Sequence, residues 1–315
     1  MVDAEYRRAY ERAASEPYGD DVWERLTAAT VDARNGDDDA LRHLGLALHR
    51  AAFCCPDATA AIYDTWTAAW LTQPRADLAD FQTATAALCR PPAIPTGLWP
   101  ALWQIVDAPA DASLTERVAA LGPLIDEARR GAFAQAQASY PGQAELAEEA
   151  PRRLVLADLE GHPQDSLGDL FHSLIVDNGF DLDVIDPDLV MGYHPQLDVT
   201  NAHILQQHEI WHLVAGYSTS PLHEIAISGF QLAQFGQLYS AMFLATIALK
   251  LSIDNPLHAR GALHVTAEAF AHGRQTRPMM NIPWRDELGS SLESIRDRYG
   301  IATFESLIPD TQAPA

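Results

Sequence analysis

The chain has 315 residues, of which 48% are hydrophobic, so it can bury a sizeable core in one large domain or two small ones. Its formal net charge of −22 makes nucleic acid and anionic membrane surfaces poor electrostatic partners. The adjacent pair Cys54-Cys55 and the lone Cys89 form neither a secreted disulfide framework nor a metal-binding spacing, which fits a reducing cytoplasm. The charged N-terminus has no apolar run, so we expect no signal or transit peptide and a cytoplasmic protein.

The first 150 residues predict a helical N-terminal region, because apolar side chains recur at helical spacing in several segments. Crowded prolines between Arg90 and Pro109 indicate an irregular connector that contains one short apolar helix. Residues 132–150 are rich in Ala, Gln and Glu and predict a solvated helix or linker. The segments that we expect to be helical are 3–34, 40–53, 56–70, 98–106 and 115–130.

Two further helices are expected before and at the most informative motif. The first runs from Asp165 to the stop signal Asn178-Gly179, and a loop follows from Asp181 to Tyr193. Thr200 is the expected N-cap of the second helix. Because no segment alternates apolar and polar residues for long enough to indicate a strand, we predict an all-α, multi-helix bundle, with at most a short pairing near Leu154.

The motif His208-Glu209-Ile210-Trp211-His212 lies on that second helix. Its two histidines are four residues apart, so both imidazoles leave the same face and can converge on one ion. The run from Gly216 to Pro221 breaks the helix and turns the chain, which lets Glu224 fold back on the pair. Two ring nitrogens and one or two carboxylates suit a divalent metal with open positions for water or substrate. We therefore predict a metal site of His208, His212, Glu224 and Glu209, in which Glu209 is also the candidate catalytic acid or base.

Two other interpretations of these residues exist. The histidines can be a purely structural pair in the core, and His-Glu-x-x-His on a helix is also the zinc peptidase motif. In the extended peptidase motif the third ligand is a histidine six residues after the second one, and that position is Ser218. A glutamate ligand of that class comes from a separate later helix, whereas Glu224 follows a short turn. The spacing therefore favours a metal site of another class.

The stretch from Ile225 to Leu249 contains no charged side chain and is long enough to span a bilayer. Three glutamines at every third position, two glycines and two serines lower its hydropathy, so a buried central helix is favoured over a membrane span. An apolar wall beside an open metal site suits a long hydrophobic substrate. We therefore predict an apolar pocket at this helix, with Phe235 and Met242 on the pocket side.

More polar residues follow this stretch. His264, Glu268 and His272 are spaced four apart and share one helix face, either as a second polar line facing the pocket or as a solvated stripe. Arg274 and Arg277 either hold an anionic head group, such as a carboxylate, or are ordinary surface charges.

The motif and its surroundings resemble the Coq-four family of ubiquinone (coenzyme Q) biosynthesis proteins. The family signature is His-acid-x-x-His followed, after eleven residues, by Glu. The segments from Gly216 to Ala226 and from Gly273 to Ile301 also match the family. The resemblance covers about residues 154–305 and is weak before them. The family usually has Asp where Glu209 stands and Gly where His223 stands, so the reach of the acid differs and His223 is an additional candidate ligand.

The resemblance implies a metal-site core at 151–305, after a divergent region at 1–150 and before a tail at 306–315. It implies an enzyme that replaces the ring carboxylate of a polyprenylated benzoate-type precursor by hydroxyl, an oxidative decarboxylation. Zinc is the first candidate cofactor, with iron or another divalent ion as alternatives. Other readings are a lipid-holding scaffold for ubiquinone enzymes, or a relative that acts on another lipid or aromatic acid. A homodimer and peripheral contact with the inner membrane are further expectations. The expected substrate-binding residues are Tyr217, His223, Arg274 and Phe235.

Overall fold

The computed structural model describes residues 2–76, 79–109, 114–143, 146, 152–179, 182 and 194–310. Within them no strand forms, and the one β-bridge pairs Ser166 with Ser291, so the prediction of an all-α fold is confirmed and the pairing expected near Leu154 is absent. The helices are α1 (Ala4–Ser15), α2 (Val22–Arg34), α3 (Asp38–Phe53), α4 (Thr59–Leu71), α5 (Phe81–Leu88), α6 (Leu98–Val106), α7 (Leu114–Ala119), α8 (Glu127–Gln137), α9 (Leu167–Asn178), α10 (Pro195–Ala215), α11 (Pro221–Phe235), α12 (Leu238–Asp254), α13 (Pro256–Gln275), α14 (Trp284–Glu287) and α15 (Leu292–Tyr299), with the 3₁₀ turns η1 (Pro56–Ala58), η2 (Gly122–Leu124), η3 (Pro141–Gln143) and η4 (Leu156–Leu159).

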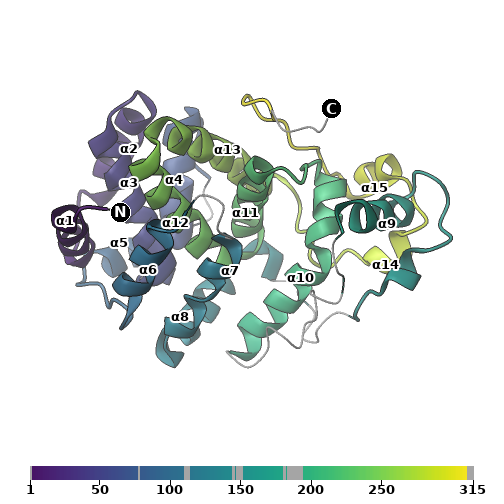
Figure 1. Ribbon diagram of the computed structural model, residues 1–315, viewed down its shortest axis with the longest axis horizontal. Coiled ribbons are helices and arrows are strands. Elements are labelled where there is room, and N and C mark those ends of the chain that lie inside the picture. Colours follow the sequence, from purple (N-terminus) through teal and green to yellow (C-terminus); the bar gives the residue numbers. More distant parts are fainter. Residues whose placement is uncertain are drawn as a thin grey trace.

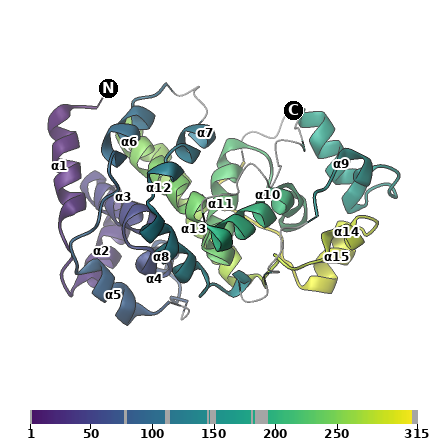
Figure 2. The ribbon, with the colours of Figure 1, turned by 90° about the horizontal axis from the view of Figure 1, so that it is seen from below.

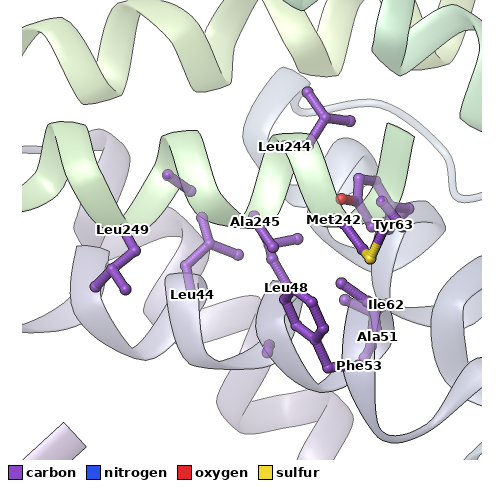
Figure 3. Close-up of a cluster of buried hydrophobic side chains, with 14 of the residues drawn as sticks. Leu44, Leu48, Ala51, Phe53, Ile62, Tyr63, Met242, Leu244, Ala245 and Leu249 are labelled. Carbon is purple, nitrogen blue, oxygen red and sulfur yellow. The ribbon is translucent and has the colours of Figure 1, made fainter. Parts of the chain in front are cut away.

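Two hydrophobic clusters form the core, and α11 and α13 contribute to both. The first cluster joins the N-terminal helices to α12 and α13 at one end of the molecule, and the second surrounds α10, α9 and α15 at the other (Figures 1 and 2). In the first cluster, Leu44 and Leu48 of α3 face Ala245 and Leu249 of α12 (Figure 3). The N-terminal helices therefore pack directly on the helices that follow the motif.

Two glycines allow α11 and α13 to pack at short range. A Cβ atom on Gly229 would lie 2.9 Å from the carbonyl oxygen of Thr266, and one on Gly273 would lie 2.7 Å from the Cβ of Ala233. Since any larger residue at these positions would collide with the neighbouring helix, the sequence fixes the separation of the two helices.

The stretch Ile225–Leu249 was expected to be one helix, and this prediction is wrong. α11 ends at Phe235, Gly236 adopts a left-handed φ of 64°, and α12 begins at Leu238. Both helices are almost entirely buried, so neither carries a charged residue there, and the uncharged run continues across the break. In the described part of the chain, no helix combines the length and the apolarity that crossing a bilayer requires.

The start of α10 also differs from the expectation. The helix begins at Pro195, with His194 as its N-cap, and Thr200 lies inside it, where its hydroxyl lies 3.1 Å from the Gln143 amide oxygen and 3.2 Å from the Gln196 carbonyl oxygen. Proline at the first helical position is a strong start signal, because its missing N–H needs no partner there. The loop expected at 181–193 lies almost wholly outside the described residues, as does most of the second half of the expected linker at 132–150.

Candidate metal centre

Three side chains from two helices converge at the end of α10. The Nε2 atoms of His208 and His212 lie 3.0 Å apart. The Glu224 carboxylate lies 3.5 Å from the first of these nitrogens and 3.3 Å from the second. Among the described residues, these three form the one group of His, Cys, Asp or Glu whose donor atoms all lie within 4.8 Å of one another.

The turn between α10 and α11 produces this arrangement. Gly216 has a left-handed φ of 79° and ends α10, which glycine does without steric strain. The Ser220 hydroxyl then accepts the His223 N–H as the N-cap of α11, and Pro221 occupies the first helical position. Glu224 thereby falls in the first turn of α11, where the helix dipole favours a carboxylate.

The protonation of His212 follows from its contacts. Its Nδ1 lies 3.3 Å from the Tyr217 carbonyl oxygen and 3.0 Å from that of Ser218, and carbonyls only accept hydrogen bonds. Nδ1 therefore carries the hydrogen, and the Nε2 lone pair points toward His208 and Glu224. Burial lowers the pKa of His212 to about 4, which keeps the ring neutral. Burial opposes protonation of His208 as well, but its hydrogen bond with Glu224 and the nearby charge of Glu209 raise its pKa.

The donor set fits a divalent ion. For a tetrahedral ion with ligand distances of about 2.1 Å, neighbouring donor atoms lie about 3.4 Å apart. The two Nε2 atoms lie 3.0 Å apart here, and each lies near that spacing from one carboxylate oxygen, His208 at 3.5 Å from Glu224 Oε2 and His212 at 3.3 Å from Glu224 Oε1. Two imidazole nitrogens and one carboxylate suit zinc and also ferrous iron, and three protein ligands leave positions open for water or substrate.

Glu209 lies outside the group of three, although the sequence placed it among the candidate ligands. It follows His208 directly, and consecutive residues on a helix point about 100° apart. Its Oε2 atom is buried without a hydrogen-bond partner, and burial raises the pKa of the carboxyl group. Glu209 therefore adds no donor atom to the group, but its charge interacts with those of His208 and Glu224, and one of its oxygens is uncommitted.

Two of the expected substrate-binding residues brace the turn. The buried Tyr217 hydroxyl lies 2.8 Å from His272 Nδ1, and the tyrosine ring stacks on Phe304 at 4.5 Å between centroids. His223 Nδ1 accepts the Ser218 N–H at 2.8 Å. Their sequence-predicted contact with substrate stays a prediction, whereas their contacts within the protein hold the turn that orients His212.

The other two expected substrate-binding residues lie in the core. Phe235 is fully buried, with its ring centroid 4.9 Å from that of Trp211. Arg274 donates from Nε and Nη2 to the two carboxylate oxygens of Asp64, at 2.9 and 3.2 Å, and from Nη1 to the Ala233 carbonyl. Asp64 is 0% exposed, so this ion pair ties α4 to α13 inside the protein.

The segment Ile301–Asp310 crosses the end of α10 and covers the turn. The Phe304 N–H donates to the Ala215 carbonyl at 2.7 Å, and the Ser218 hydroxyl donates to Asp310. Farther along, Glu268 accepts hydrogen bonds from Ser306 and from the Leu307 N–H, and it lies 3.1 Å from His264. The polar line at 264–272 therefore holds this segment, in addition to the two roles that the sequence suggests.

An apolar cleft of about 390 Å³ borders α10 on the helix face that also carries His208. Leu205 and Asn201, in its wall, lie one and two helical turns before His208. Met242, which the sequence placed on the pocket side, lines the cleft, and Phe235 does not appear in its wall. The opposite wall comes from α7, η2 and α8. The lining residues are Thr115, Ala119, Gly122, Pro123, Arg130, Gln137, Leu197, Asn201, Leu205, Gln237, Leu238, Tyr239 and Met242.

The fold and the site define an all-α protein with two histidines and one glutamate converging at a helix turn. The profile described as Coenzyme Q (ubiquinone) biosynthesis protein Coq4 matches residues 148–305, half of the chain, and includes all three donors. The chain therefore belongs to the Coq-four (Coq4) family.

Two individual proteins are similar to this chain. The Ubiquinone biosynthesis protein COQ4 homolog, mitochondrial, of Drosophila ananassae is 25% identical over 181 residues, which cover 54% of this chain and 64% of that protein. The crystal structure of a ubiquinone biosynthesis protein from Nostoc punctiforme matches 64% of this chain and 95% of its own, with a TM-score of 0.51 and 20% identity. The second likeness shows a shared fold.

Proposed function

We propose that the protein acts in ubiquinone biosynthesis by binding a polyprenylated benzoate-type precursor beside a divalent metal and decarboxylating its ring oxidatively. In this reaction the bond from ring carbon to carboxylate breaks, carbon dioxide leaves, and a carbon–oxygen bond forms to an oxygen atom from water. Dioxygen accepts the two electrons and two protons and leaves as hydrogen peroxide. The observation that supports this proposal is the spacing along α10, where Leu205 in the wall of the apolar cleft lies one helical turn before the donor His208. A ring held at the donors can thus extend its tail along α10.

In this proposal, one set of residues acts at the ring of the substrate and another set binds its polyprenyl tail. His208, His212 and Glu224 would hold the ion, which would polarise the ring oxygens and carboxylate of the substrate. Glu209 has a buried, uncommitted oxygen beside them and is suited to accept or return a proton at the ring hydroxyl. Leu205, Met242 and the other cleft residues hold the tail, because each buried methylene contributes about 0.8 kcal/mol.

A lipid-holding scaffold is the second candidate, because the cleft is lined mostly by apolar residues, whose contacts with a tail need no metal. This role uses the same tail contacts and presents the precursor to other ubiquinone enzymes. Binding at a membrane surface and formation of a homodimer stay predictions under either function. The chain spans 64% of the length of the named relative, so substrate and partners of that protein are proposals here.

Turnover by purified protein separates the two functions. The protein, loaded with zinc or with ferrous iron, is mixed with a polyprenylated 4-hydroxybenzoate in air, and loss of the carboxylate is followed by mass spectrometry. We expect product from the parent protein and none from His212→Ala, whose circular dichroism should retain most of the helical signal. Tail-dependent binding without product in every metal form would establish the scaffold and overturn the enzyme.

A further inference from the structure

A chain of buried polar side chains leads away from His208 into the protein. The amide of Gln231, on α11, contacts the Nδ1 atom of His208. The Ser240 hydroxyl lies 3.4 Å from the Gln231 amide oxygen and 2.7 Å from the Gln237 amide oxygen. All three side chains are buried, at 3%, 0% and 5% exposure, and Gln237 also lines the apolar cleft.

With the Gln237 oxygen facing Ser240, the hydrogen count favours one orientation of the Gln231 amide. If the Gln231 nitrogen faces His208, both amide oxygens require the single hydrogen of the Ser240 hydroxyl, so one acceptor is left without a donor. With the amide reversed, its nitrogen donates to Ser240, Ser240 donates to Gln237, and its oxygen accepts from His208 Nδ1. Amide oxygen and nitrogen have nearly the same shape, so the hydrogen-bond network decides between them.

The reversed orientation is the one that metal binding needs. His208 faces Glu224 and His212 through Nε2, which must therefore carry a lone pair and leave the hydrogen on Nδ1. In the other orientation the amide donates to Nδ1, the hydrogen moves to Nε2, and it points at His212 at 3.0 Å, where an ion would lie. The amide thus distinguishes a metal-ready histidine from one paired with its neighbour.

We propose that Gln231 is a positioning residue of the metal centre, whose amide oxygen holds His208 in the Nδ1–H form while Ser240 and Gln237 hold the amide. This inference rests on the proposed metal centre. Partners of this kind orient a ligating histidine and raise its basicity, and their loss typically weakens metal affinity about 10- to 100-fold. Gln231 acts through His208 and contacts no ion itself.

The test compares zinc affinity, by competition with a chelator, and the visible absorption of the cobalt-substituted protein. Gln231→Leu should bind zinc about 10- to 100-fold more weakly and shift the cobalt bands. Gln231→Glu keeps an acceptor toward Nδ1, and should restore affinity to within a few-fold of the parent (about 3-fold). Ser240→Ala removes one atom and should give a smaller loss in the same direction.

The matched control is Gln234→Leu, one turn farther along α11. Gln234 is equally buried and donates to the Gly273 and Thr276 carbonyls, so its loss should lower the melting temperature and leave zinc affinity and the cobalt bands unchanged. A parent protein that binds neither ion contradicts the proposed function before any variant is compared. A parent that binds, with Gln231→Leu and Ser240→Ala both identical to it in affinity and spectrum, overturns the positioning role. If Gln231→Leu fails to fold, Ser240→Ala and Gln231→Glu decide.

Discussion

Glu209 differs from the histidine before it in what surrounds its side chain. His208 points into a group of donors, whereas Glu209 keeps a buried oxygen without a partner. We predict that Glu209→Gln retains full zinc occupancy, because the amide keeps the shape of the side chain and no donor is lost. Turnover should fall about 10²- to 10⁴-fold if the carboxylate transfers a proton.

Metal content of the dialysed protein, read beside product formation, checks this prediction. His212→Ala provides the comparison, since it should lose the ion. A matching loss of zinc in Glu209→Gln would instead make Glu209 a ligand, as the resemblance to the family implies for the Asp at this position.

The sequence predicts a contact between two side chains only where few residues separate them along the chain. His208 and His212 share a helix, and Glu224 follows after one turn, so the structure brings together three of the four expected ligands. Arg274 was interpreted by its sequence neighbours alone, and its partner Asp64 lies 210 residues earlier in the chain. The periodic glutamines were visible in the sequence, but only the fold shows that one of them faces His208.

The α11–α13 pair permits a prediction about helices. Gly273→Ala adds a methyl group 2.7 Å from the Ala233 Cβ and 2.8 Å from the Phe230 carbonyl oxygen. The helices must move apart, and we expect a loss of about 1–3 kcal/mol in the free energy of unfolding. Urea denaturation followed by circular dichroism measures it.

Gly131→Ala, in α8, is the matched control, because a Cβ there meets nothing within 4 Å. It should stabilise the protein by about 0.4–1 kcal/mol, since alanine restricts the unfolded chain more than glycine does. Equal effects of the two substitutions would show that α11 and α13 tolerate separation.

For the helices, the sequence predicts the fold class more accurately than it predicts where each helix begins and ends. Helical periodicity identified the all-α fold, and Ser, Asn and Gly at helix ends identified α9 and the turn after α10. The break between α11 and α12 was missed because burial on both sides removed the change in polarity that marks a helix end. Gly236 marks this break, but the neighbouring sequence does not distinguish it from the glycines inside α11 and α13.

His49 ties the stability of the whole molecule to pH. It is buried in the N-terminal core, where Nδ1 lies 2.8 Å from the Tyr10 hydroxyl, and burial lowers its pKa from 6.5 to about 3. Between these two values the unfolded chain binds the proton and the folded protein does not. The free energy of unfolding therefore decreases as the pH falls from about 6.5 toward 3, by up to about 1.4 kcal/mol per pH unit.

Chemical denaturation of the parent and of His49→Gln at pH 7 and pH 4.5 measures this contribution, which should be absent from the variant. His43→Gln, on the exposed side of the same helix, should follow the parent. Comparison at each pH removes the effect of the net charge of −22, which changes in all three proteins alike. A difference between parent and His49→Gln that does not vary with pH would contradict the assignment.

The cleft joins parts of the chain that the sequence analysis treated separately. Its walls come from α7, η2 and α8 in the first 150 residues and from α10 and α12 in the family-matched part. We predict that Met242→Arg lowers the affinity for a polyprenylated aromatic acid toward that of the same acid without its tail, and leaves zinc content unchanged. Leu205→Arg, at a half-buried position of the same cleft, should do the same.

Calorimetric titration with tailed and tailless acids measures the difference. Phe235→Arg is the contrasting variant, because its ring packs on Trp211 in the core and a charge there should unfold the protein. If the parent binds both acids equally, the cleft does not hold the tail. The apolar character of this pocket was visible in the sequence, but its second wall was not, since α7 and α8 both end more than 55 residues before α10 begins.

Phe304 and Asp310 contact the turn after α10, and the ribosome synthesises both of them well after the three candidate metal ligands. About 90 residues separate His212 from Phe304, so translation at about 5–20 residues per second leaves several seconds between them. During that interval the ribosome-bound chain has its ligands but not the backbone contact that closes the turn. We therefore predict that a nascent chain arrested before Thr303 retains zinc less tightly than one released after Asp310.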